Sequence, residues 1–361
     1  MNRALRYLFL FLRSWGFRLR LKMKLKRFLF YLLGLRLNRT ESLERRESDV
    51  IQDFVELAIY SDLQTLGIAD PRNGNPKLHV FDQRKVFEVF DIILEPRQGL
   101  IFTKSGNFIE QSSNWDPHEN FLSFPWHPKD RGMQVINNPK SICLSSQSFW
   151  HWLVEDLPSV IYLINKFPDS EVLIANDSPK YVQDFLQISG SKYRVCDGPV
   201  FVKSLVFVGK GSDSGWPHPS DLEILRNFPP FKAARFNSPT KRVYISRRAS
   251  KRSPQNEDQV ERLFARYGFQ IVKTEELNLI DEVTLISQAN VLAGVHGAGL
   301  ANMVWMSPNS LLIDIVNTNY WTESNHRAAS LLDLAYIPIV YKGKLEGPID
   351  LQHVVEILDR L

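Results

Sequence analysis

The sequence predicts an α/β protein in which two units, each a parallel sheet flanked by helices, follow a basic N-terminal extension. Three observations predict this arrangement. After residue 149, β-branched apolar runs alternate with helix-like runs, a proline-rich stretch at 228–239 divides that alternation, and basic residues crowd the first 40 positions. Alternating strands and helices are typical of parallel sheets with crossover helices. We therefore expect an extension and connector at 1–75, a first α/β unit at 76–235 and a second at 236–361.

Charge is distributed unevenly along the chain. Residues 1–40 hold eleven Lys and Arg and no Asp or Glu, whereas the remainder holds 33 basic and 40 acidic residues, a net charge of −7. A nucleic-acid-binding protein would carry its positive charge on the folded domain, so we expect no nucleic-acid partner.

The extension itself, residues 1–37, mixes basic side chains with Phe, Leu and Trp. No run in it reaches the roughly 18–20 apolar residues of a membrane span. Such a segment suits the surface of an anionic bilayer, so we expect peripheral contact with the inner face of the cytoplasmic membrane. An extension that packs on the fold and an uncleaved signal anchor remain alternatives. Two cysteines without metal-ligand or disulfide spacing, Cys143 and Cys196, fit a reducing cytoplasmic compartment.

The elements of the first unit follow in order. The connector at 38–75 contains one amphipathic pattern, which predicts a helix around 49–66, and short β-like runs alternate with turns from 77 to 145. Beyond them the sequence predicts a helix at 149–167, a strand at 171–175, a helix at 179–189, a strand at 204–208 and a Gly/Ser/Pro loop at 209–219.

The second unit begins after 228–239, which its three prolines make a plausible linker. Strands are predicted at 242–245, 269–273, 291–295, 310–316 and 337–341, and helices at 256–267, 281–288, 299–305, 323–334 and 350–361. This is the pattern of a doubly wound sheet, which binds ligands beyond the carboxyl ends of its strands.

Two of those strand ends carry residues suited to an anion. One strand runs into His296-Gly297-Ala298-Gly299 and then a helix, so bare N–H groups at a helix N-terminus and glycines without Cβ admit a phosphate group. Another ends before Arg247, Arg248 and Arg252, whose guanidinium groups bind phosphates without a metal. A purely structural turn and a solvated basic surface are the alternatives, because the spacing is not that of the G-x-G-x-x-G fingerprint.

A third constellation lies in the first unit. His151 and Glu155 are four residues apart, hence on one helical face, and Asp156 follows directly. A His and a carboxylate held together can act as an acid–base pair, although a surface ion pair would show the same spacing.

Four pieces of the chain, in this order, resemble glycosyltransferase family 61. They are His151-Trp152-Leu153-Val154-Glu155, then Ile245-Ser246-Arg247 with Arg252 and Asn256-Glu257 downstream, then Gly268-Phe269, and then Val295 to Asn302. The likeness covers roughly 140–320 and leaves 1–75 outside it. The arginine block followed by His-Gly-Ala-Gly-Leu is its specific part.

The resemblance implies two Rossmann-like domains facing a cleft, the glycosyltransferase-B type, and an inverting transfer from a nucleotide-sugar donor, commonly a UDP-sugar. By the same resemblance the donor-binding residues are expected to be Arg247, Arg252, Asn256, Glu257, His296, Gly297, Ala298, Gly299 and Asn302. Glu155 stands where members of the family often carry Asp and is the expected base, with Asp156 and His151 as alternates. No Asp-X-Asp motif occurs in the chain, so we expect neither a metal ion nor another cofactor.

The expected function is transfer of a sugar to a saccharide or lipid-linked saccharide acceptor during synthesis of a cell-surface polysaccharide, as in bacterial capsular or exopolysaccharide members. A protein O-glycosyltransferase and an inactive nucleotide-sugar-binding scaffold are the alternatives. A dehydrogenase is disfavoured because the dinucleotide fingerprint is missing.

Overall fold

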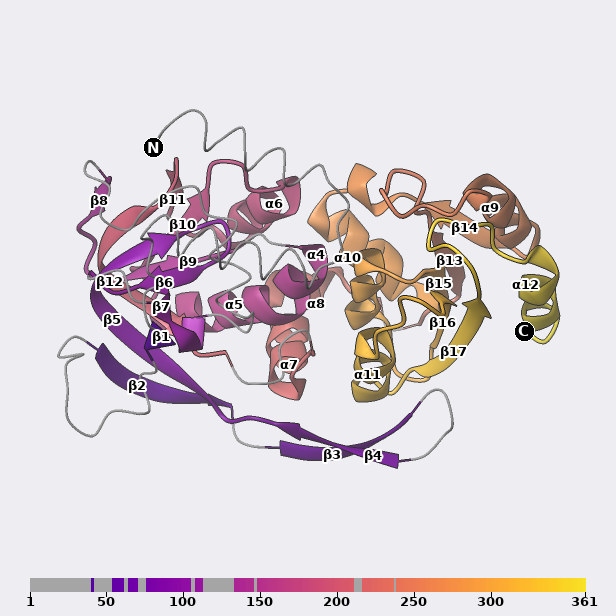
Figure 1. Cartoon of the computed structure of the whole chain (residues 1–361), viewed down its shortest axis with the longest axis horizontal. Coiled ribbons are helices and arrows are strands. Elements are labelled where there is room, and N and C mark those ends of the chain that lie inside the picture. The colour runs from indigo at the N-terminus through magenta and orange to yellow at the C-terminus, as the bar shows by residue number, and fades with distance from the viewer. Residues whose placement is uncertain are drawn as a thin grey trace, which may run out of the picture.

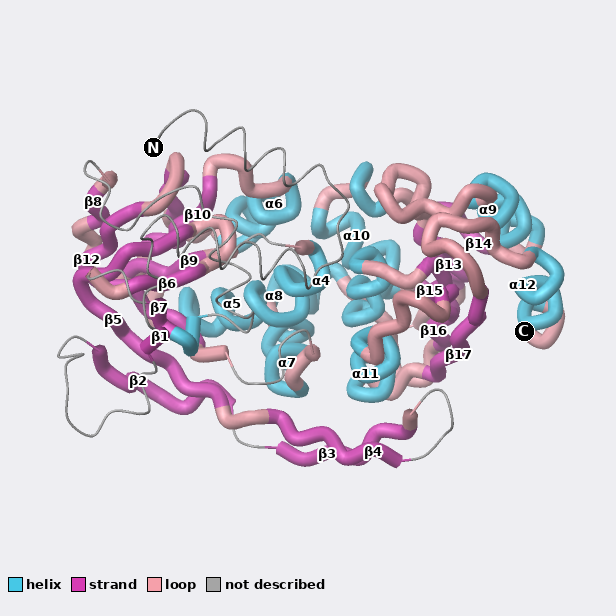
Figure 2. Tube along the Cα trace, in the orientation of Figure 1, coloured by secondary structure: helices cyan, strands magenta, loops and turns pink. Residues whose placement is uncertain are grey.

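The computed structural model describes residues 40–41, 54–61, 64–70, 76–104, 108–112, 133–145, 148–210, 216–236 and 238–361. The extension at 1–37 lies outside these ranges. Within them the chain forms two large sheets and a separate hairpin, so the α/β class is confirmed (Figure 1). Figure 2 shows most of the helices between the two sheets. No helix within these ranges has the length and apolar character that a bilayer crossing requires.

The first sheet is mixed, with the strand order β1-β7-β6-β5-β12-β9-β10-β11, β2 also pairing with β5 and β8 with β12. Its strands are β1 (Thr40–Glu41), β2 (Phe54–Ser61), β5 (Arg84–Glu95), β6 (Leu100–Phe102), β7 (Phe108–Ile109), β8 (Val135–Ile136), β9 (Ser141–Cys143), β10 (Glu171–Ala175), β11 (Tyr193–Cys196) and β12 (Val200–Val208). Strands β8 to β12 pair in parallel, as predicted, but β5 is antiparallel to β2, β6 and β12. A tight turn between β5 and β6, with Gly99 at φ +70°, enforces the antiparallel pairing.

The helix predicted around 49–66 is wrong for its described part, which forms β2 and the start of β3 (Gln64–Ala69). Val, Ile and aromatic residues in β2 pair along β5, and this tertiary partner overrides the helical spacing. Strand β3 forms a hairpin with β4 (Pro76–Phe81), an arm that runs from the first sheet towards α11 (Ser324–Leu331) (Figure 1). The Arg327 guanidinium of α11 lies 4.5 Å from the centre of the Phe81 ring, so the arm joins the two halves.

The second sheet is parallel throughout, with the order β14-β13-β15-β16-β17. Its strands are β13 (Lys241–Ile245), β14 (Phe269–Val272), β15 (Ala289–Val295), β16 (Leu311–Asn317) and β17 (Ala335–Tyr341). Numbered by their position in the chain, these strands lie in the order 2-1-3-4-5, which is a doubly wound arrangement. The order in which successive strands are added to the sheet reverses between β13 and β15, and this place is the switch point. Its helices are α9 (Glu257–Arg266), α10 (Leu279–Ser287), α11, α12 (Leu351–Leu358), and the 3₁₀ turns η3 (Thr274–Glu276) and η4 (Ala298–Trp305). The predicted pattern is confirmed, except that η4 is a 3₁₀ rather than an α-helix.

The two halves share one apolar core. The first half contributes helices α4 (Phe149–His151), α5 (Leu157–Lys166), α6 (Lys180–Ser189), α7 (Pro219–Asn227) and α8 (Pro229–Ala234), beside the 3₁₀ turn η1 (Glu110–Ser112). Helix α4 packs on η4, and α10 packs on α6 and α8. The predicted linker at 228–239 is therefore wrong in part: within α8, Phe231 is fully buried and its ring meets that of Trp305 at 5.0 Å. Proline at a first helical turn starts a helix rather than preventing one.

Candidate active site

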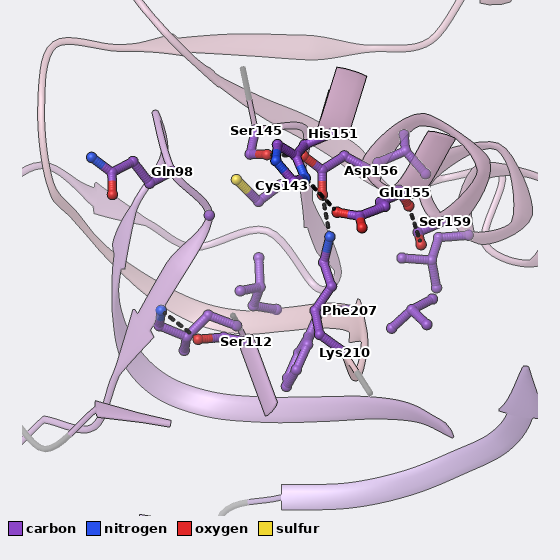
Figure 3. Close-up of a pocket in the computed structure, with 16 residues that line it drawn as sticks. Gln98, Ser112, Cys143, Ser145, His151, Glu155, Asp156, Ser159, Phe207 and Lys210 are labelled. Carbon is purple, nitrogen blue, oxygen red and sulfur yellow. Dashed lines mark hydrogen bonds and ion pairs between the residues drawn. The ribbon is translucent and has the colours of Figure 1, made fainter. Parts of the chain in front are cut away.

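A π-helical turn, η2 (Trp152–Asp156), interrupts the helix between α4 and α5. The N–H of Leu157 donates to the carbonyl of Trp152, five residues back, and Pro158 has no N–H to continue the regular ladder. The turn buries Trp152 and directs both Glu155 and Asp156 into one cavity (Figure 3). Such turns occur frequently at functional sites.

Glu155 is the buried centre of this cavity. Its carboxylate lies 3.0 Å from Nδ1 of His151, and the residue is 2% exposed. Burial alone would raise the pKa of Glu155, but the hydrogen bond with His151 and the positive charge of Lys210 outweigh it, so the pKa is lowered. The predicted pairing of His151 with Glu155 is therefore present, and it holds an ionised carboxylate out of bulk water.

Asp156 is held in a different way. Its two carboxylate oxygens contact Nζ of Lys210 and the Ser145 hydroxyl, which donates to it. Burial would lower the pKa of Lys210, but Asp156 and Glu155 raise it on balance, so the amine stays charged. Sequence reasoning missed Lys210 and Ser145. The available signal was their position, since each polar residue comes within two positions of the end of a buried strand, β12 or β9.

The cavity itself has a volume of about 60 Å³, which is room for a handful of water molecules. Figure 3 shows Lys210 pointing towards the acidic pair from the opposite wall. The lining residues are Gln98, Gly99, Ile101, Ser112, Cys143, Ser145, His151, Glu155, Asp156, Ser159, Val160, Leu163, Leu205, Phe207, Val208 and Lys210. Burial raises the pKa of the Cys143 thiol well above its usual range, so this cysteine is no nucleophile here.

Behind the cavity lies a buried ion pair that the sequence did not reveal. Nη1 of Arg84 is 2.5 Å from Asp221, and both side chains are buried. Arg84 adds to the positive charge that lowers the pKa of Glu155. Burial, together with the charges of Arg84 and Arg327, lowers the pKa of the neighbouring His218 to about 3, so that imidazole is neutral.

The second site is formed by Arg247 and the turn at 296–299. Nη1 of Arg247 contacts the carbonyl of His296 and lies 3.4 Å from that of Val295. A Cβ at Gly297 would stand 2.7 Å from Cζ of Arg247, so a glycine is needed for this close approach. The arginine and the glycine turn, placed at two strand ends by sequence reasoning, therefore share one surface.

The neighbouring side chains complete a small pocket of about 10 Å³. The Arg252 guanidinium lies 4.5 Å from the centre of the Tyr320 ring, and Nε2 of His296 lies 2.9 Å from the Thr322 hydroxyl. The lining residues are Arg247, Arg252, Val295, His296, Ile315, Asn317, Tyr320, Tyr341 and Leu345. They follow or end β13, β15, β16 and β17, so the pocket lies at the switch point of the sheet, where open α/β sheets bind ligands.

Three of the residues that sequence reasoning assigned to the donor site make hydrogen bonds within the protein. Asn256 exchanges two hydrogen bonds of 2.8 Å with the backbone of Ile349. Glu257 accepts from the Tyr244 hydroxyl at 3.0 Å and from the Arg247 N–H at 2.8 Å, which fixes the start of the arginine turn.

Asn302, the third of them, is fully buried between the halves, where it donates to Glu282 and accepts from the Trp305 indole. Ala298 and Gly299 begin η4, and a Cβ at Gly299 would stand 3.2 Å from Ile245. These positions support the pocket without lining it. Among the described residues, no group of three or more His, Cys, Asp or Glu could hold a metal ion.

A doubly wound sheet with a cationic pocket at its switch point defines the class of α/β proteins that bind ligands at the carboxyl ends of parallel strands. Residues 149–313 match the model of the family described as Glycosyltransferase 61, and this match supports the resemblance of the chain to glycosyltransferase family 61. The matched family suggests glycosyltransferase activity. None of the curated proteins compared with the chain matches it.

Proposed function

We propose that this chain is an inverting, metal-independent glycosyltransferase that moves a sugar from a UDP-sugar to a saccharide acceptor in the synthesis of a cell-surface polysaccharide. In this proposal residues 76–235 form the acceptor domain and 236–361 the donor domain of a glycosyltransferase-B arrangement. One observation carries it: Arg247 meets the 296–299 turn at the switch point, and η4, which follows that turn, packs on α4, the helix of His151. The cationic pocket and the buried carboxylate are thus joined through one pair of elements.

The donor diphosphate would lie over the second pocket, because that pocket holds no more than one water molecule as it stands. Arg247, Arg252 and the N–H groups at the start of η4 would contact its oxygens. As the bond between the anomeric carbon and the phosphate oxygen breaks, negative charge grows on the leaving UDP. Fixed guanidinium groups stabilise that charge in the way a metal ion does in other transferases.

The acceptor hydroxyl would lose its proton to Glu155 as its oxygen attacks the anomeric carbon. Two features support this role: the carboxylate is ionised despite its burial, and His151 fixes its orientation. The Asp156 carboxylate is already paired with the Lys210 amine, which makes it a weaker candidate for the base. Because the cavity admits only a few water molecules, we propose that the reacting hydroxyl enters it while the rest of the acceptor stays outside.

The proposed location is the inner face of the cytoplasmic membrane, where the basic segment 1–37 would contact anionic lipids and lipid-linked acceptors would be within reach.

Thermal shift with UDP, UDP-sugars and NAD, each with and without Mg²⁺, tests the donor site. We expect UDP to raise the melting temperature equally with and without Mg²⁺, and Arg252→Gln to remove the shift. Arg262→Gln is the matched control, because Arg262 is 68% exposed on α9 and does not line the pocket. Stabilisation by NAD alone would refute a nucleotide-sugar donor, and UDP binding without any sugar release would instead indicate an inactive scaffold.

A further inference from the structure

Asp314 is a buried acid in the middle of a parallel strand. It is fully buried in β16, with Gly294 of β15 on one side and Pro338 of β17 on the other. A carboxylate in such a place is unfavourable unless a partner offsets its charge. It lies one residue beyond the segment that matches the family model, and it does not line the pocket.

Three donors converge on one oxygen of this acid, Oδ2. They are Nδ1 of His296 at 2.9 Å, Nδ2 of Asn325 at 3.0 Å and the Tyr336 hydroxyl at 3.0 Å. Of the three, the imidazole is the one that can take a positive charge at neutral pH. Asp314 can therefore affect the pocket through its hydrogen bond with His296, because His296 lines the pocket.

The hydrogen bonds around this imidazole allow Nε2 to be either protonated or unprotonated. Nδ1 lies 2.9 Å from Oδ2 of Asp314 and 3.2 Å from Nδ2 of Asn325, and we assign the ring proton to Nδ1 because a carboxylate can only accept. Nε2 faces the Thr322 hydroxyl at 2.9 Å. A hydroxyl can donate or accept, so it satisfies Nε2 with or without a proton. The Ser324 hydroxyl, 2.7 Å from that of Thr322, can take the complementary role.

We propose that Asp314 is a positioning residue that lets His296 take up a proton from solvent when a nucleoside diphosphate enters the pocket, so that donor binding is coupled to proton uptake. The inference rests on the proposed function, since it concerns the same donor site. The proton adds to Nε2, the imidazolium donates to a phosphate oxygen, and the Asp314 carboxylate balances the new charge.

Electrostatics give the direction of this coupling. The pocket already holds the guanidinium groups of Arg247 and Arg252, and the Asp314 carboxylate lies against the imidazole of His296. A diphosphate brings negative charge to the same place and shifts the balance towards the imidazolium. The titratable and charged groups around the ring are Asp314, Arg247, Arg252, Tyr320, Tyr336 and Tyr341.

The coupling predicts that UDP binds more weakly as pH rises through the range in which imidazoles titrate, about pH 5 to 8. Asp314→Asn keeps the shape of the side chain but removes the balancing charge. A charge-assisted hydrogen bond to the phosphate would then be lost, which should weaken UDP binding about 10- to 100-fold.

Calorimetry of UDP binding to the full chain, in two buffers of different ionisation enthalpy, counts the protons taken up per UDP. We expect uptake in the wild type and none in Asp314→Asn or His296→Gln. Tyr336→Phe is the matched control, because it removes a donor from the same oxygen while leaving the charge of Asp314, so uptake should persist.

Retention of uptake in His296→Gln would overturn the inference even if Asp314→Asn does not fold. Binding of UDP to the wild type without proton uptake would also overturn it, yet would leave the proposed function standing. Failure of the wild type to bind UDP at all would instead refute the proposed function, and the coupling with it. A nitrogen-15 spectrum of the His296 ring should show Nδ1 protonated in the wild type without nucleotide, and an Nε2-protonated neutral ring there would contradict the assigned orientation.

Discussion

The two pockets differ in how their charges are balanced. In the first, two carboxylates, Glu155 and Asp156, are paired with His151 and Lys210 inside one cavity. In the second, the Arg247 guanidinium contacts carbonyl and hydroxyl oxygens, and that of Arg252 lies on an aromatic ring. Opposite charges in the first pocket lower the pKa of Glu155 and raise that of Lys210, whereas an excess of positive charge in the second favours an incoming anion.

Their construction differs as well. The first pocket takes residues from the turn after β5, from β9, from the π-helical turn and from the end of β12, and these lie far apart in the chain. The second takes most of its polar residues from the ends of adjacent parallel strands. The shape of the first pocket, which is assembled from distant segments, therefore depends on the packing of the whole first half. The shape of the second pocket depends on one edge of the second sheet.

The largest expected effect separates the roles of the pockets. Glu155→Gln removes the proposed base while keeping its volume, so the transfer rate should fall about 10²- to 10⁴-fold, with UDP affinity unchanged. Steady-state kinetics and calorimetry on the same preparation measure both. Glu223→Gln, at an exposed site on α7, is the matched control and should behave as the wild type. A wild-type rate in Glu155→Gln would remove the first pocket from the chemistry.

The next effect concerns the second pocket. Gly297→Ala keeps every charge but places a Cβ 2.7 Å from Cζ of Arg247, so the guanidinium must move away from the turn. We expect UDP affinity to fall about tenfold, because a displaced guanidinium loses a charge-assisted hydrogen bond to the diphosphate, worth about 1.5–3 kcal/mol. Gly67→Ala is the control, since no atom lies within 4 Å of the new Cβ there. Unchanged UDP binding in Gly297→Ala would mean that the nucleotide does not depend on this contact.

A smaller effect tests the charge balance of the first pocket. The charge of Lys210 helps to lower the pKa of Glu155, so Lys210→Met should raise that pKa. A base must be ionised to act; hence the acid limb of the pH–rate profile should move to higher pH, with less than a tenfold loss near neutral pH. Lys203→Met, on the exposed side of β12, should leave the profile in place. An unchanged acid limb in Lys210→Met would show that the Lys210 amine does not lower the pKa of the base.

The second half was the more predictable of the two from sequence alone. Its strands and helices follow the periodicity of the chain because each strand is buried on both faces and each crossover helix is amphipathic. Arg247 and His296 could be placed together because parallel strands end at one edge. In the first half, the strand β2 was mistaken for a helix, since its identity depends on pairing with β5.

The residues missed by sequence reasoning share a cause. Arg84 and Asp314 are defined by partners 137 and 18 residues away, so no local pattern marks them, and Lys210, whose partner is 54 residues away, is marked only by its place after β12. Conversely, Asn256 and Asn302 lie within a recognisable motif, yet their side chains bind backbone or core groups. A motif marks a segment that must keep its conformation. The structure is needed to tell which side chains of that segment line the pocket and which hold the segment in place.

A substitution at the interface between the two halves should have the smallest effect on the transfer rate but a measurable effect on stability. Glu282 of α10 is buried beside Asn302, and burial raises its pKa to about 8 from the usual 4.5. Asp184 and Glu275 raise the pKa further, while the hydrogen bond from Asn302 and the charge of Lys180 lower it. The carboxyl is therefore protonated in the folded chain at neutral pH.

The sign of the pH dependence follows from this raised pKa. Between pH 4.5 and about 8 the folded chain keeps a proton that the unfolded chain releases, so the free energy of unfolding falls as pH rises, by at most about 1.4 kcal/mol per pH unit. Glu282→Gln mimics the protonated acid and removes this slope. We expect the variant and the wild type to melt alike near pH 5, and the variant to melt higher at pH 8, with transfer rates within twofold. Glu276→Gln, in an exposed ion pair, should change the melting temperature little at either pH. Equal melting of Glu282→Gln and wild type at pH 8 would mean that water reaches this carboxyl, and that the core joining the two pockets is less dry than its packing indicates.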